Sequence, residues 1–142
     1  MKLETWPDWT EWAPFTAIGW KSIPTGPGTY MIGAHRALHR AVGVDEQGIL
    51  DIGQSKSLRR RLRTFRRCAS TDDAAGHMAG WRFQEYRMAR HFPLDKLHVC
   101  WRSFETAAEA IVEEARLLEE YVRQHMESPP LNYAASWRHR RT

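Results

Sequence analysis

One arginine of a strongly basic stretch lies where it could hold a phosphate group. Every charged residue in 56–67 is basic. On a helical wheel, Leu58, Leu62 and Phe65 form one apolar stripe, and Arg61 alone lies at its edge while the other arginines face solvent. A planar guanidinium at that edge can bind a phosphate through two hydrogen bonds. The alternative, open at this point, is that Arg61 only covers apolar surface with its stem.

A glutamate of a second helix also falls among apolar neighbours. On a wheel centred on Ile111, the apolar face of the predicted helix 105–127 includes Glu114, whereas the adjacent Glu113 points away from it. A buried, unpaired carboxylate costs on the order of several kcal/mol, so Glu114 needs a cation, either an arginine or a divalent metal. His125 falls in the same arc and is interpreted as a histidine satisfied at the helix end. Arginine, carboxylate and metal together are suited to phosphoryl transfer.

These side chains need a small mixed domain to position them. Turn signals followed by apolar residues predict one strand within 25–34 and a second strand at 49–52 after a turn at 45–48. The two strands are expected to pair antiparallel, with 35–44 as an elaborated connection, and Ser55 or Ser57 is expected to cap the helix that follows. The remaining elements are a second helix within 72–92, anchored by Trp81, Tyr86 and Phe92, a strand at 97–104, and the helix 105–127, which the prolines of 128–132 end.

Composition supports a single domain that is attracted to polyanions. The 142 residues are 42% hydrophobic and carry a net charge of +4. Two cysteines are too few for a disulfide framework, and the sequence shows neither a signal peptide nor a membrane-spanning run, so a cytoplasmic protein without a membrane partner is expected. We predict a Trp-rich arm over 1–24, with a short helix near 8–12, and a basic tail over 135–142. The arm is a possible contact surface for a protein partner.

Several of these residues occur in the order of a known nuclease family. "GTY" at 28–30, "DIG" at 51–53, Arg61, Glu114 and "PPLN" at 129–132 resemble the motifs of the GIY-YIG nuclease domain. The resemblance covers about 28–132 and implies a domain over 25–134, an α/β fold with a three-stranded antiparallel sheet flanked by helices. It also implies an endonuclease that uses Mg²⁺ or Mn²⁺ to hydrolyse phosphodiester bonds, of DNA rather than RNA.

The resemblance also implies roles for individual residues. Tyr30 would position or deprotonate the attacking water, Arg61 would steady the scissile phosphate, and Glu114 would bind the metal. Asn132 would support the site by hydrogen bonding. His77 is equally a site residue or a polar group of a loop. Basic residues around the predicted helix would contact the nucleic-acid backbone: Lys56, Arg59, Arg63, Arg66 and Arg67.

Two positions depart from the family pattern. Asp51 stands where the second motif usually has a tyrosine, and Phe65 stands where many members have a histidine or tyrosine. A carboxyl and a phenol differ by roughly six pKa units in model peptides, so Asp51 cannot simply replace a tyrosine. Asp51 could bind a metal-bound water, act as the base or pair with Arg61. Alternatively, the chain is a catalytically inactive nucleic-acid-binding module, or an interaction domain that uses its Trp-rich arm.

Overall fold

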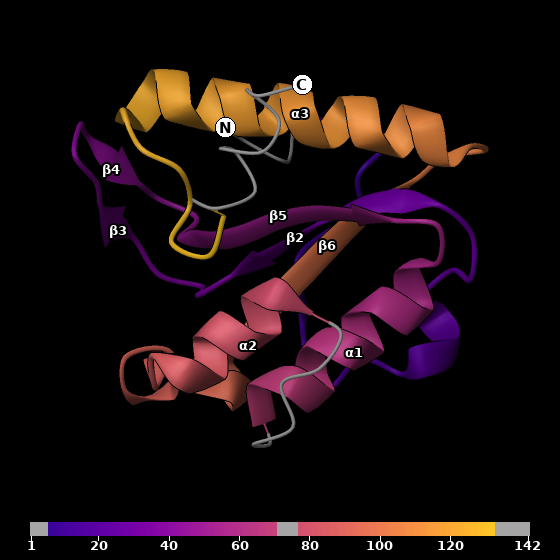
Figure 1. Cartoon of the computed structure of the whole chain (residues 1–142), viewed down its shortest axis with the longest axis horizontal. Helices are drawn as coiled ribbons and strands as arrows, with labels where there is room; N and C mark the ends of the chain where they lie inside the picture. Colours follow the sequence, from indigo (N-terminus) through magenta and orange to yellow (C-terminus); the bar gives the residue numbers. More distant parts are fainter. Residues whose placement is uncertain (1–5, 71–76, 133–142) are drawn as a thin grey trace.

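The computed structural model describes residues 6–70 and 77–132 and shows a mixed α/β arrangement, which confirms the predicted class. An antiparallel sheet lies in the middle of the molecule, with helix α3 (Ala107–His125) on one face (Figure 1). Helices α1 (Leu58–Ser70) and α2 (Met78–Glu85) cover the other face. The basic tail predicted over 135–142 lies outside the described residues.

The main sheet has one strand more than predicted. Its order is β1 (Ala13–Pro14), β6 (His98–Ser103), β2 (Gly28–Gly33) and β5 (Ile49–Ser55), and all neighbours are antiparallel. The extra strand is β1, so the expectation of a three-stranded sheet was wrong. A two-residue strand has no sequence pattern of its own and forms only because it pairs with β6.

The N-terminal arm packs along this sheet rather than forming the predicted helix at 8–12. Thr10 Oγ1 accepts a hydrogen bond from Trp101 N at 3.0 Å, and Phe15 N donates to Leu97 O at 2.8 Å. Trp9 is buried against the sheet. Tertiary contacts with β6 therefore determine the course of the arm.

The connection between β2 and β5 contains a small hairpin of β3 (Leu38–His39) and β4 (Val44–Asp45). The predicted turn is confirmed, because the Asp45 carboxylate accepts hydrogen bonds from Gln47 N and Gly48 N at 3.0 Å. Its second oxygen accepts a hydrogen bond from the hydroxyl of Tyr121 on α3 at 2.7 Å.

The helix after β5 agrees with its wheel. Leu58, Leu62 and Phe65 are fully buried, with the other core residues of this face of the sheet. Strand β5 extends beyond the predicted 49–52 and continues through Gly53 to Ser55. Ser57 N donates a hydrogen bond to Ser55 Oγ at 3.0 Å just before the helix begins.

Helix α2 packs through residues other than its predicted anchors. Phe83 is 1% exposed and lies in the core, whereas Tyr86 is 54% exposed and Trp81 is half-buried. Arg82 is buried on the same face, at 4% exposure. Large aromatic side chains alone were thus a poor guide to the buried face of this short helix.

Helix α3 is rotated relative to its predicted wheel. Ile111, the expected centre of the apolar face, is 42% exposed, and Met126 is 67% exposed. The buried face instead includes Ala110, Glu113 and Leu117. The prediction that Glu113 points away from the core was therefore wrong.

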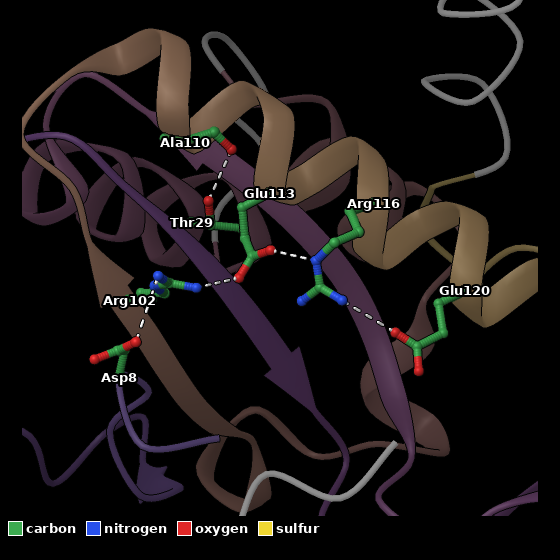
Figure 2. A network of polar contacts seen from close by, with 7 residues as sticks. All are labelled: Asp8, Thr29, Arg102, Ala110, Glu113, Arg116 and Glu120. Atoms are coloured by element: carbon green, nitrogen blue, oxygen red, sulfur yellow. Dashed lines mark hydrogen bonds and ion pairs between the residues drawn. The ribbon is translucent and has the colours of Figure 1, made fainter. Parts of the chain in front are cut away.

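Glu113 is buried because two arginines partner its carboxylate. Arg102 Nη1 lies 2.9 Å from Glu113 Oε2, and Arg116 Nε lies 2.7 Å from Glu113 Oε1 (Figure 2). Burial raises the pKa of Glu113, but the hydrogen bonds and charges of Arg116 and Arg102 outweigh that effect and hold the pKa below its usual value. One turn earlier, Thr29 Oγ1 donates to Ala110 O at 2.8 Å. These contacts join α3 to β2 and β6 and determine which side of α3 faces the sheet.

Replacement of Glu113 by Gln should lower the free energy of unfolding by about 2–3 kcal/mol, because both arginines lose a charged partner at a buried position. The matched control is Glu119→Gln on the same helix. Glu119 is 63% exposed and pairs with Arg123 at the surface, so its loss should cost under about 0.5 kcal/mol. Urea unfolding at neutral pH measures both values, and equal values for the two variants would contradict a structural role for Glu113.

Candidate functional site

Three polar side chains are buried together between the sheet and the helices α1 and α2. Tyr30 is 1% exposed, and Asp51 and His77 are each 3% exposed. Buried polar groups of this kind are costly unless they are partnered, and they concentrate at functional sites. The sequence named all three as candidates, and the structure brings them together.

The strand register explains why Tyr30 and Asp51 meet. Tyr30 is opposite Gly53, and Ile32 is opposite Asp51, so both side chains lie on the same face of the β2–β5 pair. A β-carbon at Gly53 would lie only 2.3 Å from Tyr30 Oη, so the glycine makes room for the phenol.

The hydrogen bonds of His77 determine its tautomer. Its side chain caps α2, where Nδ1 accepts a hydrogen bond from Gly80 N at 3.2 Å. Burial first, and then the charge of Arg61, lower the pKa of His77 to about 3, so the ring is neutral at pH 7. The ring proton is therefore on Nε2, which donates to Tyr30 Oη at 3.0 Å. His77 therefore lies at the start of α2, buried beside Tyr30, and not in an exposed loop.

The electrostatics of Asp51 link all three helices to the site. Burial first, and then the nearby Glu114 carboxylate, raise the pKa of Asp51 to about 7. The guanidinium groups of Arg61 and Arg82, together with a hydrogen bond from Tyr30, limit that rise. The pKa of Tyr30 is itself raised by burial and by the charge of Asp51, so the phenol stays protonated. Its hydroxyl donates a hydrogen bond to the Asp51 carboxylate.

Arg61 and Glu114 are the half-buried members of this site. Arg61 makes a hydrogen bond to Tyr30 and lines a groove of about 640 Å³ between α1 and the start of α3. Ile111 lines the same groove, and Glu114 follows three residues later on the same side of the helix. Glu114 therefore faces the site, as predicted, although the wheel that predicted this was centred on the wrong residue.

Asn132 holds the strand that carries Asp51. Its Oδ1 accepts a hydrogen bond from Ile52 N at 2.7 Å, and its Nδ2 donates to Ile52 O at 2.8 Å. Leu131 N also donates to Leu50 O at 2.9 Å. These bonds satisfy the outer edge of β5 next to Asp51, which agrees with the supporting role that the resemblance implied.

Arg82 is a member of the site that the sequence analysis missed. Its Nη1 donates to Leu131 O, and its charge acts on Asp51. A signal was available, because Arg82 falls on the same side of α2 as Ala79 and Phe83 by helical spacing.

The carboxylates of the site could hold a divalent cation. Across residues 6–70 and 77–132, no group of three or more His, Cys, Asp or Glu side chains converges as a metal site would require. Mg²⁺ does not need one, because it keeps several waters and uses one or two carboxylates with substrate phosphates. Asp51 Oδ2 is buried and has no hydrogen-bond partner within the described part of the chain, and Glu114 repels Asp51 electrostatically. A cation would relieve both costs, so Asp51 and Glu114 fit such an ion.

The predicted backbone-contacting residues occupy different environments. Lys56 is exposed and lines the groove of Arg61, and Arg67 is also exposed. Arg59 is half-buried and donates to Ile23 O at 2.9 Å, so it is not simply a solvent-facing cation. Arg63 and Arg66 lie over the ring of Trp20; both are considered below with the outer face of α1.

No family model, curated protein or solved structure matches this chain. Within the described residues, no helix is long and apolar enough to span a membrane. Both cysteines are buried, and neither forms a disulfide.

Gly53→Ala should destabilise the fold by about 1–3 kcal/mol, because the added methyl group displaces the Tyr30 ring. Gly26→Ala is the matched control, since nothing lies within 4 Å of a β-carbon there. The double variant Gly53→Ala with Tyr30→Ala should lose less than the sum of the two single variants. Strict additivity in urea unfolding would show that the two residues do not compete for the same space.

The contribution of Asp51 to stability should fall as pH rises through its pKa, whereas that of His77, whose pKa is lowered to about 3, rises with pH over part of the same range. The folded-state pKa, about 7, exceeds the ordinary value of 3.8, so the folded state favours the protonated carboxyl. This contribution is complete below the ordinary pKa and is lost as pH rises to about 7, by up to about 4 kcal/mol.

Urea unfolding between about pH 4 and pH 8, with a chelator present, measures this loss as the difference between Asp51→Asn and the wild type, because His77 contributes to both. Relative to the wild type, Asp51→Asn should gain stability as pH rises, whereas the exposed Asp95→Asn should not. The same pH dependence in Asp51→Asn and the wild type would exclude Asp51 as a source of the loss.

Proposed function

We propose that this chain is a divalent-metal-dependent endonuclease of the GIY-YIG type that hydrolyses phosphodiester bonds, with DNA as its substrate. The observation that carries the proposal is that Tyr30, Asp51 and Glu114 act on one another electrostatically beside Arg61, which lines a groove with basic walls. These residues come from four separate elements, β2, β5, α1 and α3, and occur in the order of the motifs in the sequence. A packed core gains nothing from collecting two carboxylates and a phenol at one point.

Arg61 is the group suited to hold the scissile phosphate. Its guanidinium lies at the boundary between the groove and the buried cluster, in contact with Tyr30. A fixed cation there neutralises charge as it develops on the phosphate during attack. The neighbouring Arg60 and Lys56 line the same groove and favour entry of a polyanion.

Asp51 is the group suited to accept a proton. General bases work best when their pKa lies near the working pH, and the pKa of Asp51 is about 7. Tyr30, by contrast, keeps its proton and orients the carboxylate by donating to it. His77 donates to Tyr30 from the other side and so fixes the direction of this hydrogen bond. Proton acceptance, which many family members would assign to a phenol, is here assigned to a carboxyl.

Mg²⁺ or Mn²⁺, when bound, would polarise a phosphoryl oxygen. Glu114 is the residue that would hold the ion. Burial first, and then the charge of Glu114, raise the pKa of Asp51, so a cation held by Glu114 would lower that pKa and favour the ionised carboxylate that accepts the proton.

The apolar residue at 65 is compatible with this site. Phe65 is fully buried, and its ring lies edge-on to His77 with 5.2 Å between centroids. It therefore helps to hold the imidazole that donates to Tyr30. His77 reaches the site from the start of α2, so a polar group at 65 is not needed to contact the phenol.

A second candidate function is binding without cleavage. The observation that favours it is the burial of Tyr30 and Asp51, at 1% and 3% exposure, behind the groove that a substrate would occupy. In that case the basic groove would still bind nucleic acid.

Metal-dependent cleavage distinguishes these functions. The purified protein is incubated with plasmid, branched DNA, single-stranded DNA and RNA, with Mg²⁺, Mn²⁺ or a chelator. Cleavage should require the metal, and Arg61→Ala or Glu114→Gln should lower its rate by about 10²–10³. Asp51→Asn should be as impaired, because the amide cannot accept the proton.

The matched controls are Arg123→Ala and Glu119→Gln, an exposed ion pair of α3 that does not line the groove of Arg61. Both should cut at the wild-type rate. Cleavage that survives in Arg61→Ala and in Glu114→Gln would refute this assignment of the site. Tight binding without any cleavage by the wild type would favour the second function.

A further inference from the structure

A second basic groove runs along the outer side of α1. It has a volume of about 600 Å³, and its walls include Trp20, Arg59, Arg63 and Arg66. None of these four lines the groove of Arg61. The two grooves therefore lie on opposite sides of one helix.

A ridge separates the two grooves. It is formed by four residues that line both grooves: Ser57, just before α1, and Arg60, Thr64 and Arg67 on α1. Their spacing of three and four residues places them in one row along the exposed surface of the helix. The same row thus presents two arginines between the two grooves.

The outer groove holds positive charge that the described part of the chain does not neutralise. Elsewhere, arginines form ion pairs, as in Arg40 with Glu127 and Arg102 with Glu113. Among the described residues, no ion pair involves Arg63 or Arg66. Like charges collected on one helix face repel one another, and a bound polyanion would offset that repulsion.

Several of these guanidinium groups are held in place. Arg63 and Arg66 each lie 5.7 Å from the centre of the Trp20 ring. Trp20 in turn packs edge-on against Phe15, with 6.4 Å between ring centroids. Arg59 is tied to the backbone by hydrogen bonds to Ile23 O and Lys21 O. A guanidinium that is already ordered loses less entropy when it binds a phosphate.

We infer that the outer groove binds the backbone of the strand that is not cut, so that the substrate is a duplex straddling α1. An α-helix with its side chains is about 10–12 Å across, and the major groove that separates the two backbones of B-DNA is about 12 Å wide. The minor groove, at about 6 Å, is too narrow for the ridge. That the groove of Arg61 holds the strand that is cut rests on the proposed function.

Binding in the absence of metal tests this inference separately from cleavage. Fluorescence anisotropy with a chelator present gives the affinity for a duplex of about 20 base pairs and for one of its strands alone. The variant Arg63→Glu/Arg66→Glu should bind the duplex at least about tenfold more weakly. The slope of log affinity against log salt should become shallower by about 2, since each lost phosphate contact contributes about 0.9. Affinity for the single strand should change less than about threefold.

The matched control is Arg90→Glu/Arg123→Glu, which changes the net charge equally at exposed positions away from α1. This control should lower the affinity for the duplex and for the single strand equally and only slightly. Arg63→Gln/Arg66→Gln, with its melting temperature measured, guards against unfolding by charge reversal. An unchanged duplex affinity, or an equal loss for duplex and single strand, would overturn the inference. Selective loss of duplex binding by a protein that never cleaves would support the groove and count against the nuclease.

Discussion

The structure depends on the burial of a hydrogen-bonded polar cluster at the face of a β-sheet. Tyr30 and Asp51 lie on this face, where a domain of this size would normally place only apolar side chains. Each must therefore have a partner from the helices that cover the face. Helix α1 supplies Arg61 and the N-terminus of α2 supplies His77, so the arrangement of both helices is coupled to the polar groups they cover.

Two adjacent glutamates of α3 differ in their roles: Glu113 stabilises the packing of the helix, and Glu114 belongs to the proposed site. Glu113 is buried between arginines, and this pairing determines the rotation of the helix on the sheet. Once that rotation is set, the next residue is turned by about 100° toward α1. Glu114 thereby acts on Asp51 without belonging to the core. The ion pairs of Glu113 therefore also help to set the position of Glu114.

The difference between α1 and α3 shows what the sequence could predict. In α1 the apolar stripe is bordered by arginines, so periodicity identified its buried face and the position of Arg61 correctly. In α3 alanine, isoleucine and valine are spread over several faces of the first turns, so the wheel was centred on the exposed Ile111. Hydrophobicity could not show that a charged residue, Glu113, is buried. That depends on Arg102, which reaches it from a strand and is unrelated to it by helical spacing. The short strand β1 was unpredictable for the same reason, because its pairing is entirely tertiary.

The carboxyl at position 51 is suited to the way β2 and β5 pair. Gly53 lets the phenol of Tyr30 approach the backbone of β5, which brings its hydroxyl within reach of the side chain two residues earlier. A second phenol at 51 would have to share this enclosed space with Tyr30 and with Arg61. A short carboxyl fits, and burial beside Glu114 brings its pKa near neutrality. Burial thus changes the chemistry of this aspartate, because it moves the carboxyl from a permanent anion toward a group that can gain and lose a proton near pH 7.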